Sequence, residues 1–77
     1  MSELLEDLAR RLVDEPNAVR VDRAEEDGEL VLRLYVAEAD RGKVIGRQGR
    51  IARALRTIVR ASAVRERQRV RLEIVDD

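Results

Sequence analysis

Residues 30–37, with the sequence Leu-Val-Leu-Arg-Leu-Tyr-Val-Ala, are the most apolar strand that this chain predicts. Side chains alternate between the two faces of a strand, so Leu30, Leu32, Leu34 and Val36 share one face. The other face carries Val31, Arg33 and Tyr35 and is therefore apolar in part. Near-continuous apolar runs are typical of strands buried inside a sheet. We therefore place this strand at the centre of the sheet.

Two further segments with alternating side chains predict the neighbouring strands. Residues 18–25 begin with Val19 and Val21 between polar residues, and the dipeptide Asp27-Gly28 that follows is typical of a tight hairpin turn. Residues 68–75 place Val70, Leu72 and Ile74 between charged residues. The hairpin makes the first two strands antiparallel.

Three segments show helical periodicity. The first is residues 2–13, which Pro16 brings to an end. A short turn at residues 40–45, with Asp40 as a candidate cap, precedes the longest helix at residues 50–64. The apolar side of this helix is expected to hold Ile51, Leu55, Ile58, Val59 and Ser62. The opposite side collects Arg50, Arg53, Arg56 and Arg60.

The order of these elements is α-β-β-α-α-β. The long connection from the second to the third strand suits a parallel, right-handed crossover. A chain of 77 residues has room for one small domain. The sequence therefore predicts an α+β fold in which residues 1–77 form a single domain, a three-stranded mixed sheet with helices packed on one face.

The basic residues are concentrated in the second half of the chain. Residues 1–40 hold 12 acidic residues and 5 Arg, whereas residues 41–77 hold 11 basic and 4 acidic residues. All seven cations of residues 41–60 lie in a stretch without an acid. Although the net charge is zero, this segregation indicates a localised anion-binding surface, with an ordinary solvated helix face as the alternative. The acids at the hairpin tip, residues 25–27, are expected to form a solvated turn.

The composition argues against catalysis. The chain has no Cys and no His, which removes thiolate nucleophiles, Cys-based zinc sites and the commonest general base. We expect no enzyme activity, no metal ion, no cofactor and no small-molecule substrate. No apolar run approaches the roughly 20 residues of a membrane-spanning helix, and the acidic start is unlike a signal peptide. We therefore expect a cytoplasmic protein.

The turn Gly46-Arg47-Gln48-Gly49, between the short helix and the long one, carries the chemistry. Glycine permits a sharp turn and the close approach of another chain. The start of the helix that follows favours an anion, and Lys43, Arg47 and Arg50 bracket that point. The spacings of a P-loop and of a dinucleotide-binding fingerprint are absent. The cluster fits a sugar-phosphate backbone.

With Val44-Ile45 before the turn and a basic amphipathic helix after it, the segment resembles the KH-domain signature, a GxxG loop that clamps single-stranded nucleic acid. The element order is that of the bacterial type II KH domain, and residues 42–54 are similar to the small single-domain KH proteins of the KhpA family. The resemblance covers nearly the whole chain. It implies a single-stranded RNA-binding protein, an RNA chaperone or post-transcriptional regulator that acts with the KH protein KhpB in cell elongation and envelope homeostasis.

The resemblance also assigns roles to residues. It makes Gly46 and Gly49 the clamp glycines of the loop at residues 46–49, with Arg47 and Gln48 facing the RNA backbone. Ile45 would line an apolar groove for the bases. Leu55 would lie behind Ile45, and Ala52 stands where many KH domains carry Ile.

Five cations outside the loop complete these expectations. Lys43, Arg50 and Arg53 are expected to contact phosphates, whereas Arg56 and Arg60 are expected to pair with acids of the first half of the chain. Tyr35 is the only aromatic residue, so we expect little base stacking and low sequence discrimination. The alternative function is that of a protein-interaction subunit, a homodimer or a heterodimer with a KhpB-type protein, in which the small residues 61–64 provide close packing and RNA binding is secondary.

Overall fold

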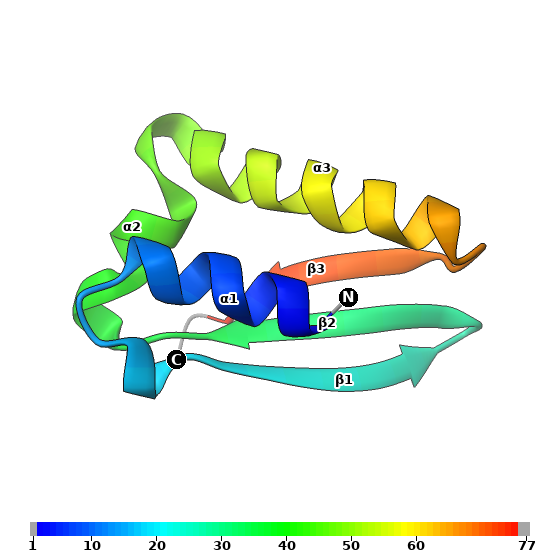
Figure 1. The fold of residues 1–77 in the computed structure, drawn as a ribbon, viewed down its shortest axis with the longest axis horizontal. Coiled ribbons are helices and arrows are strands. Elements are labelled where there is room, and N and C mark those ends of the chain that lie inside the picture. The colour runs from blue at the N-terminus through cyan, green and yellow to red at the C-terminus, as the bar shows by residue number, and fades with distance from the viewer. Residues whose placement is uncertain (1, 76–77) are drawn as a thin grey trace.

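The computed structural model of this chain describes residues 2–75, which form a three-stranded sheet with its helices on one face (Figure 1). Its helices and strands, in chain order, are α1 (Ser2–Leu12), β1 (Arg20–Glu26), β2 (Glu29–Tyr35), α2 (Arg41–Ile45), α3 (Arg50–Arg65) and β3 (Val70–Ile74). Short 3₁₀ turns occupy Pro16–Ala18, Glu38–Asp40 and Arg47–Gly49. The α-β-β-α-α-β order expected from the sequence is confirmed.

The strand order in the sheet is β1-β2-β3, so the apolar strand β2 is central as expected. It pairs antiparallel with β1 and parallel with β3, which makes the sheet mixed. At the hairpin, Asp27 and Gly28 have φ angles of 54° and 77°. Positive φ at both positions is the requirement of the turn that matches the twist of the two strands.

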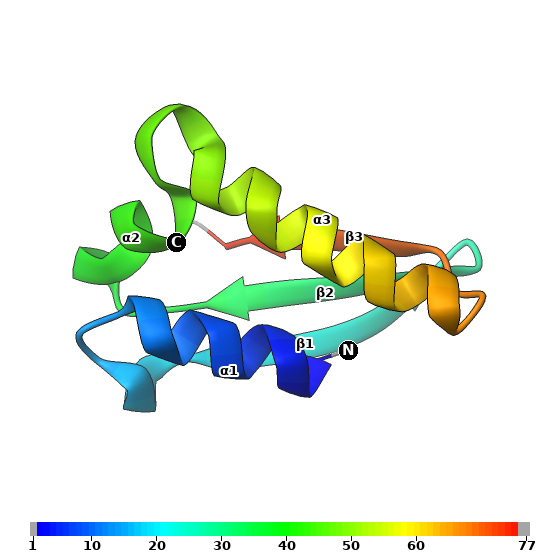
Figure 2. The ribbon, with the colours of Figure 1, turned by 45° about the horizontal axis from the view of Figure 1, so that its top comes forward.

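The core lies between the inner face of the sheet and the two long helices, which cover the same face in both views (Figures 1 and 2). The leucines at positions 30, 32 and 34 of β2 are 5% exposed or less and pack with Leu72 of β3. Leu5 and Ala9 of α1, and Leu55 and Val59 of α3, complete this cluster. The alternation of β2 thus decides which face the helices cover.

The long helix departs from expectation in the residues that it buries. Ile58, expected on the core side, is exposed, whereas Ala52 and Ala63 are buried with Leu55 and Val59. The two alanines allow the helix backbone to lie close to the sheet, where a bulkier side chain would hold it away. The buried stripe of α3 is therefore turned toward β3, and Ile58 comes to lie on the side of α1.

Candidate nucleic-acid interface

The turn between α2 and α3 projects from the body of the molecule (Figures 1 and 2). Gly46 ends α2 with φ 75° and ψ 172°, a conformation that only glycine adopts readily. Gln48 and Gly49 follow with φ angles of 56° and 74°. The backbone therefore reverses sharply over residues 46–49 and leaves Arg47 and Gln48 exposed to solvent.

The two glycines of this loop meet different surroundings. A Cβ added to Gly46 would lie 2.6 Å from Cγ1 of Ile51, so no side chain fits there. A Cβ added to Gly49 would meet nothing within 4 Å. Gly46 is needed to pack the loop, whereas Gly49 leaves open space in front of the backbone where another chain can approach.

The start of α3 favours a negatively charged ligand. The helix has no acidic residue in its first turn and no side-chain cap, so its positive dipole end is not neutralised locally. Nη2 of Arg53 donates a hydrogen bond of 2.6 Å to the carbonyl oxygen of Gln48. This bond places the Arg53 guanidinium beside the loop, as the sequence led us to expect.

Lys43 lies differently from the other candidate cations. Its ammonium group pairs with Asp14 and with Asp40, the latter at 3.3 Å. The hydrogen bond to Asp14 raises the pKa of Lys43, and the bond to Asp40 adds to this effect against the opposing effect of burial. A phosphate contact by Lys43 would have to form alongside these two carboxylates.

Asp40 acts as a latch between α1 and α2 and does not cap α2 by a side-chain hydrogen bond, contrary to expectation. Its carboxylate, 1% exposed, accepts hydrogen bonds from the backbone N–H groups of Asp14 at 3.2 Å and Glu15 at 3.0 Å. Burial opposes ionisation of Asp40, but these bonds and Lys43 together hold its pKa below the ordinary value of 3.8. The spacing of three residues between Asp40 and Lys43 can be read from the sequence. The contact between Asp40 and Asp14, which are 26 positions apart, cannot.

The four arginines expected together on α3 divide between two flanks of the helix. Nε of Arg56 donates to the carbonyl oxygen of Leu72 at 3.4 Å, which turns this flank toward β3. Helical spacing places Arg53 and Arg60 on the same flank, whereas Arg50 lines a groove on the side of α1. Within residues 2–75, Arg56 and Arg60 form no ion pair, so the expectation that they pair with acids is wrong.

Ile45 and Leu55, expected to line and to back one apolar groove, lie in different surroundings. Leu55 lies in a groove of about 330 Å³ between α1 and α3, where most of the lining is apolar: Leu8, Leu12, Ile51, Ala54, Leu55 and Ile58, with Arg11 and Arg50. Ile45 is 39% exposed and lines neither this groove nor the hollow described next. Ala52, at the position where many KH domains carry Ile, is buried.

A second hollow, of about 600 Å³, runs along the edge of β3. Arg56 of α3 and Leu72 and Ile74 of β3 line it, together with Tyr35 at the end of β2. The guanidinium of Arg20 lies 4.0 Å from the centre of the Tyr35 ring, a cation–π contact that occupies one face of the ring. The aromatic surface left for a base is correspondingly small.

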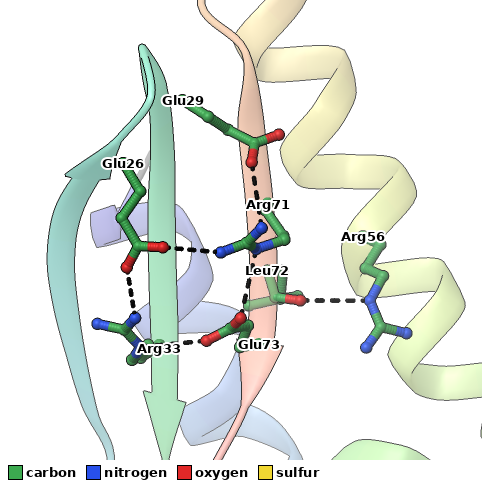
Figure 3. A network of polar contacts seen from close by, with 7 residues as sticks. All are labelled: Glu26, Glu29, Arg33, Arg56, Arg71, Leu72 and Glu73. Carbon is green, nitrogen blue, oxygen red and sulfur yellow. Dashed lines mark hydrogen bonds and ion pairs between the residues drawn. The ribbon is translucent and has the colours of Figure 1, made fainter.

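The face of the sheet that carries no helix is covered by a network of paired charges (Figure 3). Arg33 binds Glu26 at 2.8 Å and Glu73 at 3.1 Å, and Arg71 contacts Glu26, Glu29 and Glu73. The hydrogen bond from Arg33 lowers the pKa of Glu26. Glu26, expected in a solvated turn, is thus part of a network across three strands. Because its cations are already neutralised, this face offers little attraction to a polyanion.

In the part of the chain that the structure describes, no group of three or more His, Cys, Asp or Glu could hold a metal ion. No helix among residues 2–75 is both long enough and apolar enough to cross a membrane.

Comparison with protein families matches residues 2–74 to the family described as "KhpA/KhpB, KH domain". The RNA-binding protein KhpA of Clostridium acetobutylicum is 49% identical over 75 residues, which cover 97% of this chain and all of that protein. KhpA of Treponema pallidum is 51% identical over 74 residues, covering 96% of this chain and 92% of that one. KhpA of Bacillus subtilis is 45% identical over 76 residues, covering 99% and 94%.

Among solved structures, the chain resembles Era in its crystal structure with MgGDPNP and nucleotides 1506–1542 of 16S ribosomal RNA. The TM-score is 0.64 at 21% sequence identity, and the match covers 95% of this chain but 28% of the Era chain. At this identity the likeness shows the fold alone. It confirms the α+β arrangement expected from the sequence.

Proposed function

The chain belongs to the KhpA/KhpB family of KH domains, and from this premise we propose that it binds single-stranded RNA through the loop at residues 46–49. The observation that carries the proposal is the open space in front of Gly49, at the start of a helix without acidic residues. The curated relatives are named RNA-binding proteins. KH loops of this kind hold about four nucleotides by their backbone.

The proposed RNA binding depends on charge and on the shape of the loop rather than on specific contacts with the bases. Arg47 and Gln48 face the RNA backbone, Arg50 and Arg53 stand within the first turn of α3, and Ile45 and Lys43 border the loop from α2. With one aromatic residue in the chain, we expect low discrimination among bases. A single module of this kind binds weakly, and useful affinity comes from several modules acting together.

In the cell, this activity suits an RNA chaperone or post-transcriptional regulator in the cytoplasm. The resemblance to the KhpA family links that role to cell elongation and envelope homeostasis, with a KhpB-type protein as partner. The proposed role requires no catalytic residue, cofactor or metal ion. We take residues 1–77 to act as one domain.

Replacement of Arg47 and Gln48 by Asp tests the proposal. Both glycines remain, and Asp tolerates the left-handed conformation of position 48, so the fold should persist. We expect RNA binding to be lost in fluorescence anisotropy while the thermal unfolding temperature stays within a few degrees. The matched control changes Arg67 and Gln68 to Asp, the same dipeptide at the other end of α3. Undiminished RNA binding by a folded loop variant would exclude the proposal.

A second candidate function is favoured by the groove between α1 and α3, and we infer that its occupant is a second copy of this chain. Leu12 and Ile58 expose 37% and 39% of their surface there. The first turns of α1 expose Glu3 and Asp7, whereas α3 carries only cations, so the start of α1 in one copy can face α3 of another; Arg10 and Arg11 restrict this complementarity to the start of α1. Of the small residues 61–64, Ala63 is core and Val64 is exposed, so they provide no continuous packing surface.

Sedimentation over a range of concentrations separates this candidate from the first. Ile58→Asp places a charge in the groove without touching the buried stripe of α3. A concentration-dependent dimer that Ile58→Asp dissociates, with RNA binding retained, would support self-association as a separate function. A monomer at all concentrations would exclude it, and association only with a KhpB-type protein would replace the second copy by that partner.

A further inference from the structure

The peptide unit between Gln48 and Gly49 is held at both of its polar groups. Its carbonyl oxygen, which belongs to Gln48, accepts the hydrogen bond of 2.6 Å from Nη2 of Arg53. Its N–H, which belongs to Gly49, donates to the carbonyl oxygen of Gly46 at 3.1 Å. The first bond joins the loop to α3, and the second joins the two glycines at the ends of the loop. Together the two bonds set the orientation of this peptide unit.

The backbone of Gln48 needs such support because its conformation is unfavourable. Its φ of 56° and ψ of 25° lie in the left-handed region, which residues other than Gly, Asn and Asp rarely adopt. Gly49 has a similar conformation, with φ 74° and ψ 16°, but glycine adopts it without a steric penalty. The strain of the loop is therefore concentrated at the residue whose carbonyl group Arg53 holds.

Helix geometry explains why Arg53 reaches this carbonyl group. Arg53 lies in the first turn of α3, and helical side chains are tilted toward the N-terminus of their helix, which here is the side of the loop. Its side chain is exposed to solvent, so burial in the core does not impose this position. Because the donor is a charged guanidinium, the bond is stronger than a hydrogen bond between neutral groups.

We infer that Arg53 is a positioning residue of the RNA-binding loop. It acts through the carbonyl group of Gln48 and holds residues 46–49 in the conformation that leaves the space in front of Gly49 open. This inference rests on the proposed function and gives Arg53 a different role from the direct phosphate contact expected from the sequence. A loop that takes the binding conformation only part of the time lowers the affinity in proportion, so Arg53 raises affinity by organising the loop before RNA arrives.

Hydrogen exchange of the Gly49 N–H, followed by NMR on the free protein, tests this role without RNA. Arg53→Gln should increase the exchange rate about fivefold, because this N–H is exposed whenever the loop opens locally. Arg50→Gln is the matched control. It removes the same charge from the same turn of α3, but Arg50 lies on the side of α1, so the exchange rate of Gly49 should not change.

Binding of an oligouridylate of four nucleotides, measured by fluorescence anisotropy, separates positioning from phosphate contact. Arg53→Gln should weaken binding about threefold and leave the slope of log affinity against log salt unchanged. Loss of a phosphate contact would instead reduce that slope by about 0.7. In a chain that also carries Gln48→Asn, Arg53→Gln should weaken binding less, because Asn adopts the left-handed conformation more readily than Gln does.

Four results would overturn the inference: an exchange rate of Gly49 that Arg53→Gln leaves unchanged or that Arg50→Gln increases equally, undiminished RNA affinity in Arg53→Gln, a salt slope reduced by about 0.7 in that variant, or an equal loss of affinity with and without Gln48→Asn. Failure of the proposed function gives a different pattern. The exchange rate would then respond to Arg53→Gln as expected, while the double variant Arg47→Asp, Gln48→Asp would bind the oligouridylate as well as the native chain does.

Discussion

Ile51 packs directly against Gly46, so that a Cβ on Gly46 would lie 2.6 Å from Cγ1 of Ile51. The first side chain of α3 to pack inward thus closes onto the end of α2. The loop between them is held in shape by a contact within the protein. Its outer surface at Gly49 remains free of such contacts.

This asymmetry makes the two glycines unequal toward substitution. Gly46→Ala combines a backbone conformation costing about 1–3 kcal/mol with overpacking of about 1–3 kcal/mol, whereas Gly49→Ala costs about 1–2 kcal/mol. We expect Gly46→Ala to lower the thermal unfolding temperature by roughly 10 °C or more. Gly49→Ala should lower it by about half as much. Equal losses in calorimetry would contradict the packing of Ile51 against Gly46.

The buried carboxylate of Asp40 should make stability depend on pH. Its pKa is lower in the folded chain than the ordinary 3.8, so the ionised latch stabilises the fold above about pH 4 and this contribution disappears as the pH falls through the lower, folded value. Asp40→Asn should therefore reduce the unfolding temperature at pH 7, and its difference from the native chain should shrink between pH 4 and pH 2.

Thermal melts of Asp40→Asn and of Glu38→Gln over this pH range supply the measurement and its control. Glu38 lies in the same turn but is exposed. A deficit of Asp40→Asn that stays constant down to pH 2, or that Glu38→Gln reproduces, would show that the latch does not depend on the charge of Asp40.

The elements of the fold were predictable because each rests on local chemistry. The Asp27-Gly28 turn, the alternation of β2 and the glycines around α3 are properties of neighbouring residues, and the observed bounds differ from the expected ones by a few residues. β2 ends at Tyr35 rather than at Ala37, because the chain enters the turn Glu38–Asp40 that carries the latch.

The features that sequence reasoning missed depend on which flank of a helix faces which neighbour. A helical wheel groups Arg50 with Arg56, but only the position of β3 shows that Arg56 reaches Leu72 while Arg50 borders α1. The pairing of Asp40 with the N–H groups of Asp14 and Glu15 likewise joins residues about 25 positions apart. Such contacts arise from packing and leave no local pattern.

Lys43 precedes Gly46 in the sequence and Arg47 follows it. Substitution of Lys43 should affect mainly stability, whereas substitution of Arg47 should affect mainly RNA binding. Lys43→Gln leaves Asp14 and Asp40 without their cation, so it should lower the unfolding temperature more than it lowers affinity. Arg47→Gln should leave stability unchanged and reduce RNA affinity about fivefold at 0.1 M salt. If Lys43→Gln weakens binding as much as Arg47→Gln at unchanged stability, Lys43 contacts phosphate rather than closing the latch.

The salt dependence of binding to an RNA of four nucleotides should depend on the cations of the loop at residues 46–49 and not on the paired cations on the open face of the sheet. About three phosphate contacts give a slope of log affinity against log salt of about −2 for a single strand. Arg47→Gln should reduce the slope by about 0.7, since it removes one contact. Arg33→Gln removes an equal charge from the network with Glu26 and Glu73, where that charge is already neutralised, and should leave the slope unchanged. Anisotropy titrations at four salt concentrations measure the slope of each variant. If Arg33→Gln reduces the slope as much as Arg47→Gln does, the RNA lies on the open face of the sheet.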